Sequence, residues 1–332
     1  MSRKFRIAFF ALSAFCCLAG WPDKHSALAV RAPLLSATPY TVYSTTHHIN
    51  TVFVIMFENH DWSLIHGSSF APYINSLLPI AAHAERYYNP PTMHPSLPNY
   101  LYLEAGRNFS IWNDKAPSVN SQTTTNHLVT RLTTLGISWK AYAEDISGTE
   151  CPLSSSGAYA VNHNPFVYFD DVTENQNIGS TTCISHIRPF SELQTDIAAG
   201  TVASYNFIIP DLCDDMHNAC TGNPIAQGDT WLSLNLPVIL CSPAYLKGGA
   251  VFIIWDESEN PDAVLVAGCN PPDHSIGMIV LSPFAKRGYS SWIRYEHGAT
   301  LRTMEEIFGI TPILLGDIAR DADLSDLFST FP

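Results

Sequence analysis

Residues Thr51–Phe57 have the sequence TVFVIMF, a continuous apolar run rich in β-branched side chains, and the polar residues Glu58-Asn59-His60-Asp61 follow it directly. Runs of this length and composition are typical of strands buried on both faces of a parallel sheet. Similar runs lie at residues 205–210, 250–255 and 277–282, with a weaker candidate at 137–142. The sequence therefore predicts a mostly parallel central sheet.

Segments with helical spacing alternate with these apolar runs. They lie at residues 72–87, 127–135, 189–199, 230–241 and 300–308. Strands that alternate with helices are typical of an α/β fold in which helices sandwich the sheet. No repeat or linker interrupts the chain after its first part, so we expect a single domain over residues 49–332.

The N-terminal residues have the pattern of an export signal. Arg3, Lys4 and Arg6 precede an apolar run at residues 7–20, and Ala27-Leu28-Ala29 provides a small-x-small cleavage pattern. We therefore expect a signal peptide at residues 1–29 and an extended arm at 30–48, with a membrane anchor as the alternative. After signal removal no integral membrane segment is expected, and the predicted location is secreted or periplasmic.

Charge and cysteine content narrow the class of protein further. The 332 residues include 17 Lys and Arg against 30 Asp and Glu, which gives a formal net charge of −13. Nucleic-acid binding depends on Lys and Arg displacing counterions, so a nucleic-acid partner is not expected. Six of the 8 cysteines follow the signal. In an oxidising compartment these six cysteines predict up to three disulfides, and the sequence leaves their pairing undetermined. Cys213 and Cys220 are close in sequence, and a disulfide between them could close a loop.

Acidic and amide side chains follow three of the predicted strands. They are Glu58-Asn59, then Asp211, Asp214 and Asp215 with His217, and finally Asp256-Glu257. Because ligand sites of open α/β sheets lie beyond the carboxyl ends of the strands, we expect these groups to converge at one edge. The repulsion between these acidic groups favours a divalent cation between them, whose identity the sequence does not specify. The alternative is that they are turn residues and helix caps.

A second polar segment, residues 92–100 with the sequence TMHPSLPNY, precedes an apolar helical pattern. Pro98 is consistent with a helix that opens there, which places Ser96 near a helix N-terminus. The free N–H groups and the dipole at such a terminus favour an anion, either a phosphate or a serine alkoxide. The alternative is that Ser96 caps the helix. The sequence contains no GxSxG, P-loop or GxGxxG motif.

Five short motifs together resemble a known family. They are Glu58-Asn59-His60, residues 94–100 (HPSLPNY), residues 163–166 (HNPF), residues 211–217 and Trp255-Asp256-Glu257. In their order and number they resemble the secreted phosphoesterase family, which contains bacterial and fungal acid phosphatases and bacterial phospholipases C. The resemblance extends from about residue 51 to residue 308. It implies an alkaline-phosphatase-like fold.

The resemblance also implies roles for individual residues. The expected ligands of one divalent cation are Glu58, Asn59, Asp256 and Glu257. The expected nucleophile is Ser96, with Thr92 as its rival. His163 and His217 resemble the histidines that hold phosphate oxygens or protonate the leaving group, and His94, Asn99 and Asp215 are expected to bind substrate. His274 is a further candidate ligand of lower rank.

Together these observations predict a secreted, metal-dependent acid phosphatase that hydrolyses phosphate monoesters through a serine phosphoenzyme. The acidic pair is followed by Ser258-Glu259-Asn260, where phospholipases C often continue with His and Gly-Gly, so the monoesterase is favoured over a phospholipase C. A secreted cation-binding module without turnover is the alternative from another class. Such a module would need the acidic clusters but not Ser96 and two histidines.

Overall fold

The structure is a computed structural model that describes residues 48–259, 274–310, 315–318 and 321–332. Its sheet has eight strands in the order β5-β4-β6-β1-β7-β8-β2-β9. Their bounds are Thr51–Phe57 (β1), Ala82–Ala84 (β2), Trp139–Ala143 (β4), Ile187–Pro189 (β5), Tyr205–Ile209 (β6), Gly249–Trp255 (β7), Met278–Leu281 (β8) and Tyr289–Ser291 (β9). Strand β8 is antiparallel to β7 and β2, and the other pairings are parallel. A mostly parallel sheet is therefore confirmed.

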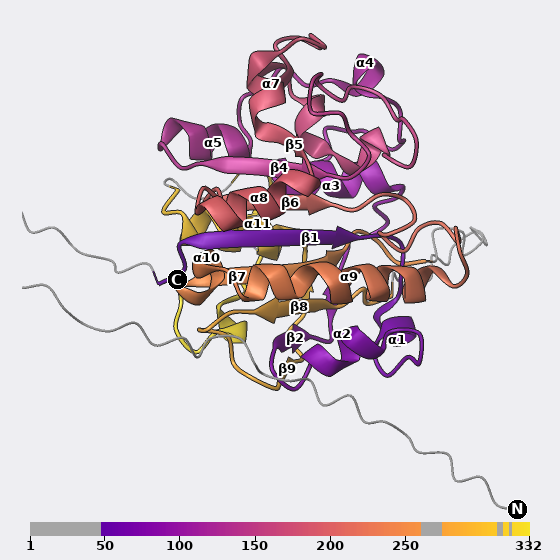
Figure 1. The fold of residues 1–332 in the computed structure, drawn as a ribbon, viewed down its shortest axis with the longest axis vertical. Coiled ribbons are helices and arrows are strands. Elements are labelled where there is room, and N and C mark those ends of the chain that lie inside the picture. The colour runs from indigo at the N-terminus through magenta and orange to yellow at the C-terminus, as the bar shows by residue number, and fades with distance from the viewer. Residues whose placement is uncertain (1–47, 260–273, 311–314, 319–320) are drawn as a thin grey trace, which may run out of the picture. The chain divides into compact units, whose positions relative to one another are not determined.

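The helices lie along the sheet and at its ends. Their bounds are Trp62–Ile65 (α1), Pro72–Leu77 (α2), Ser96–Ala105 (α3), Pro117–Asn120 (α4), Leu128–Thr134 (α5), Asp170–Thr173 (α6), Thr181–His186 (α7), Ser191–Ala199 (α8), Pro224–Leu240 (α9), Pro243–Leu246 (α10) and His297–Ile307 (α11). Short 3-10 turns cover Val161–His163, Pro165–Tyr168 and Ser325–Leu327, and Tyr87–Tyr88 (β3) pairs with Tyr295–Glu296 (β10). Helix α9 lies in front of the sheet and α11 behind it (Figure 1).

The two faces of the sheet pack against different helices because strand side chains alternate in direction. Phe57 at the end of β1 meets Trp231 of α9 edge to face, with ring centroids 6.1 Å apart. On the opposite face, Phe207 of β6 meets Tyr100 of α3 at 6.3 Å. Strand β7 is buried along its whole length, as the apolar run predicted. The expected sandwich of helices around the sheet is confirmed.

Two predicted helices differ from the observed ones. The helix predicted at 72–87 ends at Leu77, and the segment that follows contains β2 and β3. Pro79 has no N–H for a helical hydrogen bond, and β2 gains its backbone partners from β8 and β9 instead. Helix α9 begins at Pro224, earlier than residue 230, because the side chain of Asn223 accepts a hydrogen bond from the Ala226 N–H at 3.1 Å.

Two disulfides join described residues. Cys151 pairs with Cys183, and Cys213 pairs with Cys220, which closes the loop after β6 as the sequence suggested. Cys269 lies outside the described residues, so the third predicted disulfide stays a prediction. The predicted signal peptide also lies outside them, as does the predicted arm except for His48. In the part of the chain that is described, no helix has the length and apolar character needed to cross a membrane.

An ion cluster around the buried His127 holds the C-terminal half of α3. Glu104 of α3 lies with its Oε1 2.8 Å from His127 Nδ1, and Asp171 Oδ1 lies 3.0 Å from His127 Nε2. The His127 ring is fully buried and stacks on Phe169 at 3.8 Å. Burial by itself would lower the pKa of His127, but the hydrogen bonds with Asp171 and Glu104 outweigh it and raise the pKa. The imidazole of His127 therefore links α3 to α5 and α6.

We predict that this cluster makes the protein more stable at acidic pH. Because the pKa of His127 is raised in the folded state, its stabilisation is complete below the ordinary histidine value and is lost as pH rises through the raised pKa. His127→Gln should lower the free energy of unfolding by about 3 kcal/mol at pH 5, and by less at pH 8. Urea unfolding across this pH range measures both quantities.

His186→Gln is the matched control. His186 is half-buried against Trp139, and burial lowers its pKa, so its contribution to stability changes with pH in the opposite sense. If His127→Gln lost the same stability at both pH values, the ion cluster would not be the source of the pH dependence.

Candidate active site

The expected convergence at one sheet edge is present. Glu58 follows β1, Asp256 follows β7 and Asp215 lies in the loop after β6; these three strands are parallel neighbours. Backbone hydrogen bonds join the three segments: the Glu58 N–H donates to the Asp215 carbonyl at 2.8 Å, and the Asp256 N–H donates to the Phe57 carbonyl at 3.0 Å. Glu58 and Asp256 are fully buried, and Asp215 is nearly so.

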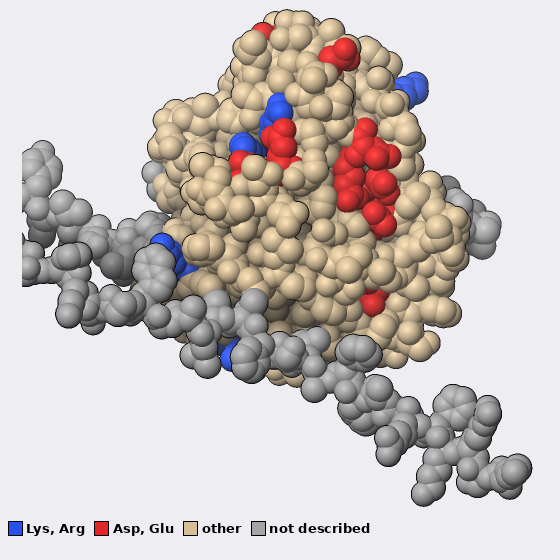
Figure 2. Space-filling model, in the orientation of Figure 1, with Lys and Arg blue, Asp and Glu red and all other residues tan. Residues whose placement is uncertain are grey.

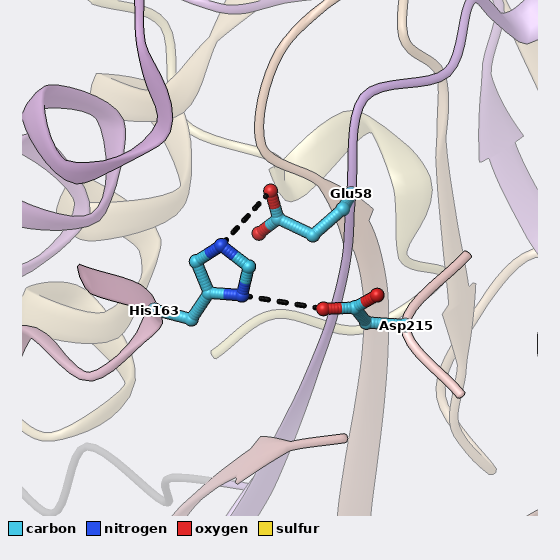
Figure 3. Close-up of side chains that lie close together, drawn as sticks. All are labelled: Glu58, His163 and Asp215. Atoms are coloured by element: carbon cyan, nitrogen blue, oxygen red, sulfur yellow. Dashed lines mark ion pairs between the residues drawn. The ribbon is translucent and has the colours of Figure 1, made fainter. Parts of the chain in front are cut away.

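His163 lies between two of these carboxylates (Figure 3). Its Nε2 is 3.4 Å from Glu58 Oε2, and its Nδ1 is 3.2 Å from Asp215 Oδ2. The ring comes from the 3-10 turn Val161–His163 and is buried. Ligand atoms of these three side chains lie within 4.8 Å of one another, a spacing that could hold a metal ion.

Helix α3 brings two hydroxyl groups to Glu58. Ser96 is the first residue of the helix, and its Oγ donates to Glu58 Oε2 at 2.9 Å. Pro95 occupies the N-cap position, so Ser96 does not act as the cap. One turn later, the Tyr100 hydroxyl donates to Glu58 Oε1, and the Tyr100 ring stacks on His163 with centroids 5.4 Å apart. Both carboxylate oxygens of Glu58 therefore accept a hydrogen bond from helix α3.

Glu257 is directed towards the segment that precedes Ser96. Its Oε2 lies 2.8 Å from His94 Nδ1 and accepts a hydrogen bond from Asn99 Nδ2 at 3.1 Å. The same Asn99 amide donates to the Met93 carbonyl at 2.9 Å. The carboxylate of Glu257 thus ties the loop before α3 to the end of β7, next to Asp256.

Asn59 connects the two carboxylates at the strand ends. Its backbone N–H donates to Asp256 Oδ1 at 2.9 Å, and its φ of 45° is in the left-handed region, which asparagine tolerates better than most residues. With the side-chain amide nitrogen turned towards the carboxylates, it lies 3.0 Å from both Glu58 Oε2 and Asp256 Oδ1. The opposite orientation presents the amide oxygen to the same space, as a cation ligand would.

Burial and mutual repulsion raise the pKa values of the carboxylates. Burial, with the nearby charges of Asp256 and Asp215, raises the pKa of Glu58 well above its usual value. Burial and the charge of Asp256 raise the pKa of Glu257 to about 8, and burial raises that of Asp215 to about 7. Every ion pair that these acids form with a described residue has a histidine as its partner.

The chemistry of His163 favours a cation at this cluster. Burial lowers the pKa of His163 to about 4, so the ring is neutral at neutral pH and donates from one nitrogen alone. Both ring nitrogens nevertheless face carboxylate oxygens. The second contact therefore either holds a carboxyl proton or lacks a proton altogether, and Asp215 Oδ2 accepts no hydrogen bond. A divalent cation bound between these groups would satisfy the orphaned atoms and the repulsion together.

The remaining predicted residues lie around this cluster. His217 is exposed, with its ring centroid 6.1 Å from that of His163, and its backbone N–H donates to Asp215 Oδ1 at 2.8 Å. His274 Nδ1 lies 2.6 Å from Asp61 Oδ2 and is not part of the cluster around Glu58, His163 and Asp215. Thr92 is exposed and, like Asn59, has a positive φ, of 62°. The roles assigned to all of these residues stay predictions.

Sequence reasoning did not assign a role to two residues of the site. Tyr100 lies one helical turn after Ser96, so the spacing of the TMHPSLPNY segment contained the signal that both hydroxyls face one way. His297 begins α11, and its Nε2 lies 2.5 Å from the Asp256 carbonyl while its Nδ1 is 3.1 Å from the Tyr87 hydroxyl. No local pattern indicated His297, because its partners are distant in sequence.

The fold resembles that of two solved structures. A protein of the alkaline phosphatase superfamily from Vibrio parahaemolyticus matches with a TM-score of 0.54 and 10% identity, over 79% of this chain and 67% of that one. A phosphonate monoester hydrolase from Silicibacter pomeroyi matches with a TM-score of 0.52 and 10% identity, over 86% of this chain and 77% of that one. At such identities the likeness shows the fold alone, which is that of the alkaline phosphatase superfamily.

The family follows from the sequence comparison. Residues 68–311 match the Phosphoesterase family, and the chain belongs to that family. A phosphatidylinositol-3-phosphatase of Mycobacterium tuberculosis is 28% identical over 260 residues, which are 78% of this chain and 77% of that protein. The phosphate-repressible acid phosphatase of Penicillium chrysogenum is 28% identical over 231 residues, 64% of this chain and 53% of that protein. The chain is a hydrolase of phosphoric ester bonds and spans about half the length of this fungal relative.

Tyr100→Phe should test how far the tyrosine hydroxyl positions Glu58. The substitution keeps the ring that stacks on His163 but leaves Glu58 Oε1 without its donor. We expect kcat for p-nitrophenyl phosphate to fall about tenfold, since loss of a supporting hydrogen bond at a site typically costs 10- to 100-fold. Tyr102→Phe on the same helix is the control, and an equal effect of the two substitutions would contradict the assignment.

Proposed function

We propose that the chain is an exported, metal-dependent acid phosphatase that hydrolyses phosphate monoesters through a serine phosphoenzyme. The observation that carries the proposal is the hydrogen bond of 2.9 Å from Ser96 Oγ to the buried carboxylate of Glu58. This contact brings a serine hydroxyl, a buried acid and a helix N-terminus together at the sheet edge, which supports the proposal. A cation-binding module without turnover would not need this hydroxyl.

Ser96 is the proposed nucleophile. Its proton points to Glu58 Oε2, which can accept it as Oγ attacks phosphorus. The Leu97 N–H is already used, since it donates to Asp114 Oδ1 at 2.9 Å. The positive end of the α3 dipole nevertheless faces the charge that develops on the phosphoryl group. The covalent phosphoserine would then be hydrolysed by water at the same position.

His217 is the better placed of the two proposed catalytic histidines to protonate the leaving group. It is exposed at the rim of the site, in the loop that the Cys213–Cys220 disulfide closes. His163 is buried behind it, stacked on Tyr100, and is suited to orient the carboxylates of Glu58 and Asp215. A general acid that works as imidazolium favours acidic conditions.

The proposed cation site contains Glu58, Asn59 and Asp256, with Glu257 adjacent to it in sequence. Their oxygens suit a hard divalent cation, and Glu58 is also part of the cluster with His163 and Asp215. When bound, the cation supplies positive charge that offsets charge on the phosphoryl oxygens. His94 and Asn99, which contact Glu257, are proposed to orient the substrate with Asp215.

Two further observations support the choice of activity and location. The relatives in the comparison are named as phosphatases, which favours a monoesterase over a phospholipase C. The two disulfides suit an oxidising compartment and so support export of the chain. The predicted signal peptide at residues 1–29 is consistent with that route.

Ser96→Ala should abolish covalent catalysis. We expect kcat for p-nitrophenyl phosphate to fall about 10³-fold or more, while product binding weakens far less, because the lost interaction belongs mainly to the transition state. In the unmodified protein, acid quenching during turnover should trap phosphate on the peptide that contains Ser96.

Thr92→Ala is the control for this assignment. Thr92 lies four residues before Ser96 and has an exposed side chain. If Thr92→Ala removed activity and Ser96→Ala retained it, the nucleophile would be the threonine. The alternative that the chain is a phospholipase C would then gain support. Attack by water without a phosphoenzyme would be indicated if neither substitution reduced turnover.

Removal of the metal should stop the reaction. Glu58→Gln and Asp256→Asn each delete a buried charge at nearly constant volume, and each should lower activity by about 10²-fold or more. Isothermal titration with Mn²⁺ should show weaker binding to both variants than to the unmodified protein. Unchanged turnover after chelation and in both variants would refute metal dependence.

A further inference from the structure

Asp114 places a negative charge where a bound anion would be expected. Its Oδ1 accepts a hydrogen bond of 2.9 Å from the N–H of Leu97, the residue directly after Ser96 at the start of α3. The N–H groups at a helix N-terminus are typical partners of phosphate oxygens. Asp114 belongs to the segment between α3 and α4, 17 residues further along the chain than Leu97. A carboxylate from another segment is therefore held next to the proposed nucleophile.

The charge of Asp114 also acts on other groups of the site. Burial has the largest effect on the pKa values of Glu257 and His163, raising the first and lowering the second, and the charge of Asp114 raises both. Burial also raises the pKa of Tyr168 most, and Asp114 adds to that increase. Asp114 is therefore within electrostatic range of the end of β7 and of the two 3-10 turns, as well as in contact with α3.

One oxygen of Asp114 remains available to a ligand. The Leu97 N–H holds Oδ1, whereas Oδ2 forms no hydrogen bond or ion pair with any residue that the structure describes. Asp114 is exposed, so a ligand from solution can reach it. A carboxylate oxygen accepts hydrogen bonds and cannot donate one. A ligand that pairs with Oδ2 must therefore bring the proton itself.

The surroundings of Asp114 disfavour a ligand with two negative charges. Figure 2 shows a patch of Asp and Glu side chains at the edge of the sheet towards which β1 points. The buried acids Glu58, Asp215 and Asp256 lie at the same edge. These carboxylates oppose each further negative charge on a ligand. A phosphate group that keeps one proton has one charge less than the doubly ionised form and also provides the O–H donor that Oδ2 of Asp114 requires.

We propose that Asp114 is a specificity-determining residue that selects a phosphoryl group carrying one proton, because its Oδ2 accepts a hydrogen bond from the P–OH group. The proposal rests on the proposed phosphatase function and adds the ionisation state of the substrate. Phosphate monoesters have such a proton below about pH 6. Sulfate monoesters and phosphate diesters carry the same single charge but have no acidic proton, so Asp114 disfavours both.

Methylphosphonate and methanesulfonate form a matched pair of ligands for a binding test. At pH 5 both carry one negative charge and have nearly the same size, but only methylphosphonate has an acidic proton. In isothermal titration of the full chain with Mn²⁺ present, we expect the unmodified protein to bind methylphosphonate about tenfold more tightly, since a hydrogen bond to a charged group is lost with the sulfonate. Asp114→Asn should bind the two ligands about equally. The asparagine oxygen still accepts from the Leu97 N–H, but an amide donor replaces Oδ2.

Asp317→Asn is the matched control. Asp317 lies at the other end of α3, where its backbone N–H donates to the Gly106 carbonyl at 3.0 Å, and its side chain is 80% exposed. This substitution also removes one negative charge, but it should leave the ratio of the two dissociation constants unchanged. The proposal would be refuted if the unmodified protein bound neither ligand or bound both equally. It would also be refuted if Asp114→Asn did not change the ratio, which is the result expected of a residue that only caps α3.

The pH dependence of hydrolysis tests the same selection during turnover. In the unmodified protein, kcat/KM for p-nitrophenyl phosphate should fall above about pH 6 as the ester loses its second proton. In Asp114→Asn the fall between pH 5 and pH 8 should be about tenfold smaller, because an amide donor pairs with the deprotonated oxygen. Profiles of the same shape in the two proteins would contradict the proposal. If the binding preference were found and depended on Asp114 while no phosphate ester were hydrolysed, the selection would stand and the phosphatase would fail.

Discussion

The organisation of the site depends on one buried carboxylate, that of Glu58 at the end of β1. The group is fully buried, so its charge must be compensated from inside the protein. Both oxygens are in use: Tyr100 donates to one, and the other faces Ser96 and His163. Because burial and neighbouring acids raise its pKa, the group is suited to exchange a proton or to ligate a cation.

Helix α3 connects the buried carboxylate of Glu58 to a second polar cluster in the fold. At its first residue Ser96 contacts Glu58, and near its last turn Glu104 contacts the buried His127. The helix is thus held at both ends by polar contacts in a dry environment, where an unpaired group would be costly. Stability and site geometry are therefore coupled through one helix of 10 residues. The edge of the sheet fixes the strand ends, and α3 fixes the hydroxyl that faces them.

Local patterns predicted much of this arrangement. The apolar runs identified β1, β6, β7 and β8 because a strand buried on both faces needs apolar side chains at nearly every position. The acidic groups after β1, β6 and β7 were expected at one edge of the sheet, and Glu58, Asp215 and Asp256 lie there. The prediction that a helix continues after Leu77 was wrong. A buried three-residue strand such as Ala82–Ala84 is defined by its partners β8 and β9 and not by its own composition.

The sequence by itself determined the class of fold, the family and the residue types at the site, because apolar periodicity and short motifs are local properties. The tertiary structure alone decided which of those residues meet. It placed His163 between Glu58 and Asp215, directed Glu257 to His94, and brought His297 to the Asp256 carbonyl. These contacts join segments that are distant along the chain. Their geometry depends on strand order and helix packing, which no local pattern encodes.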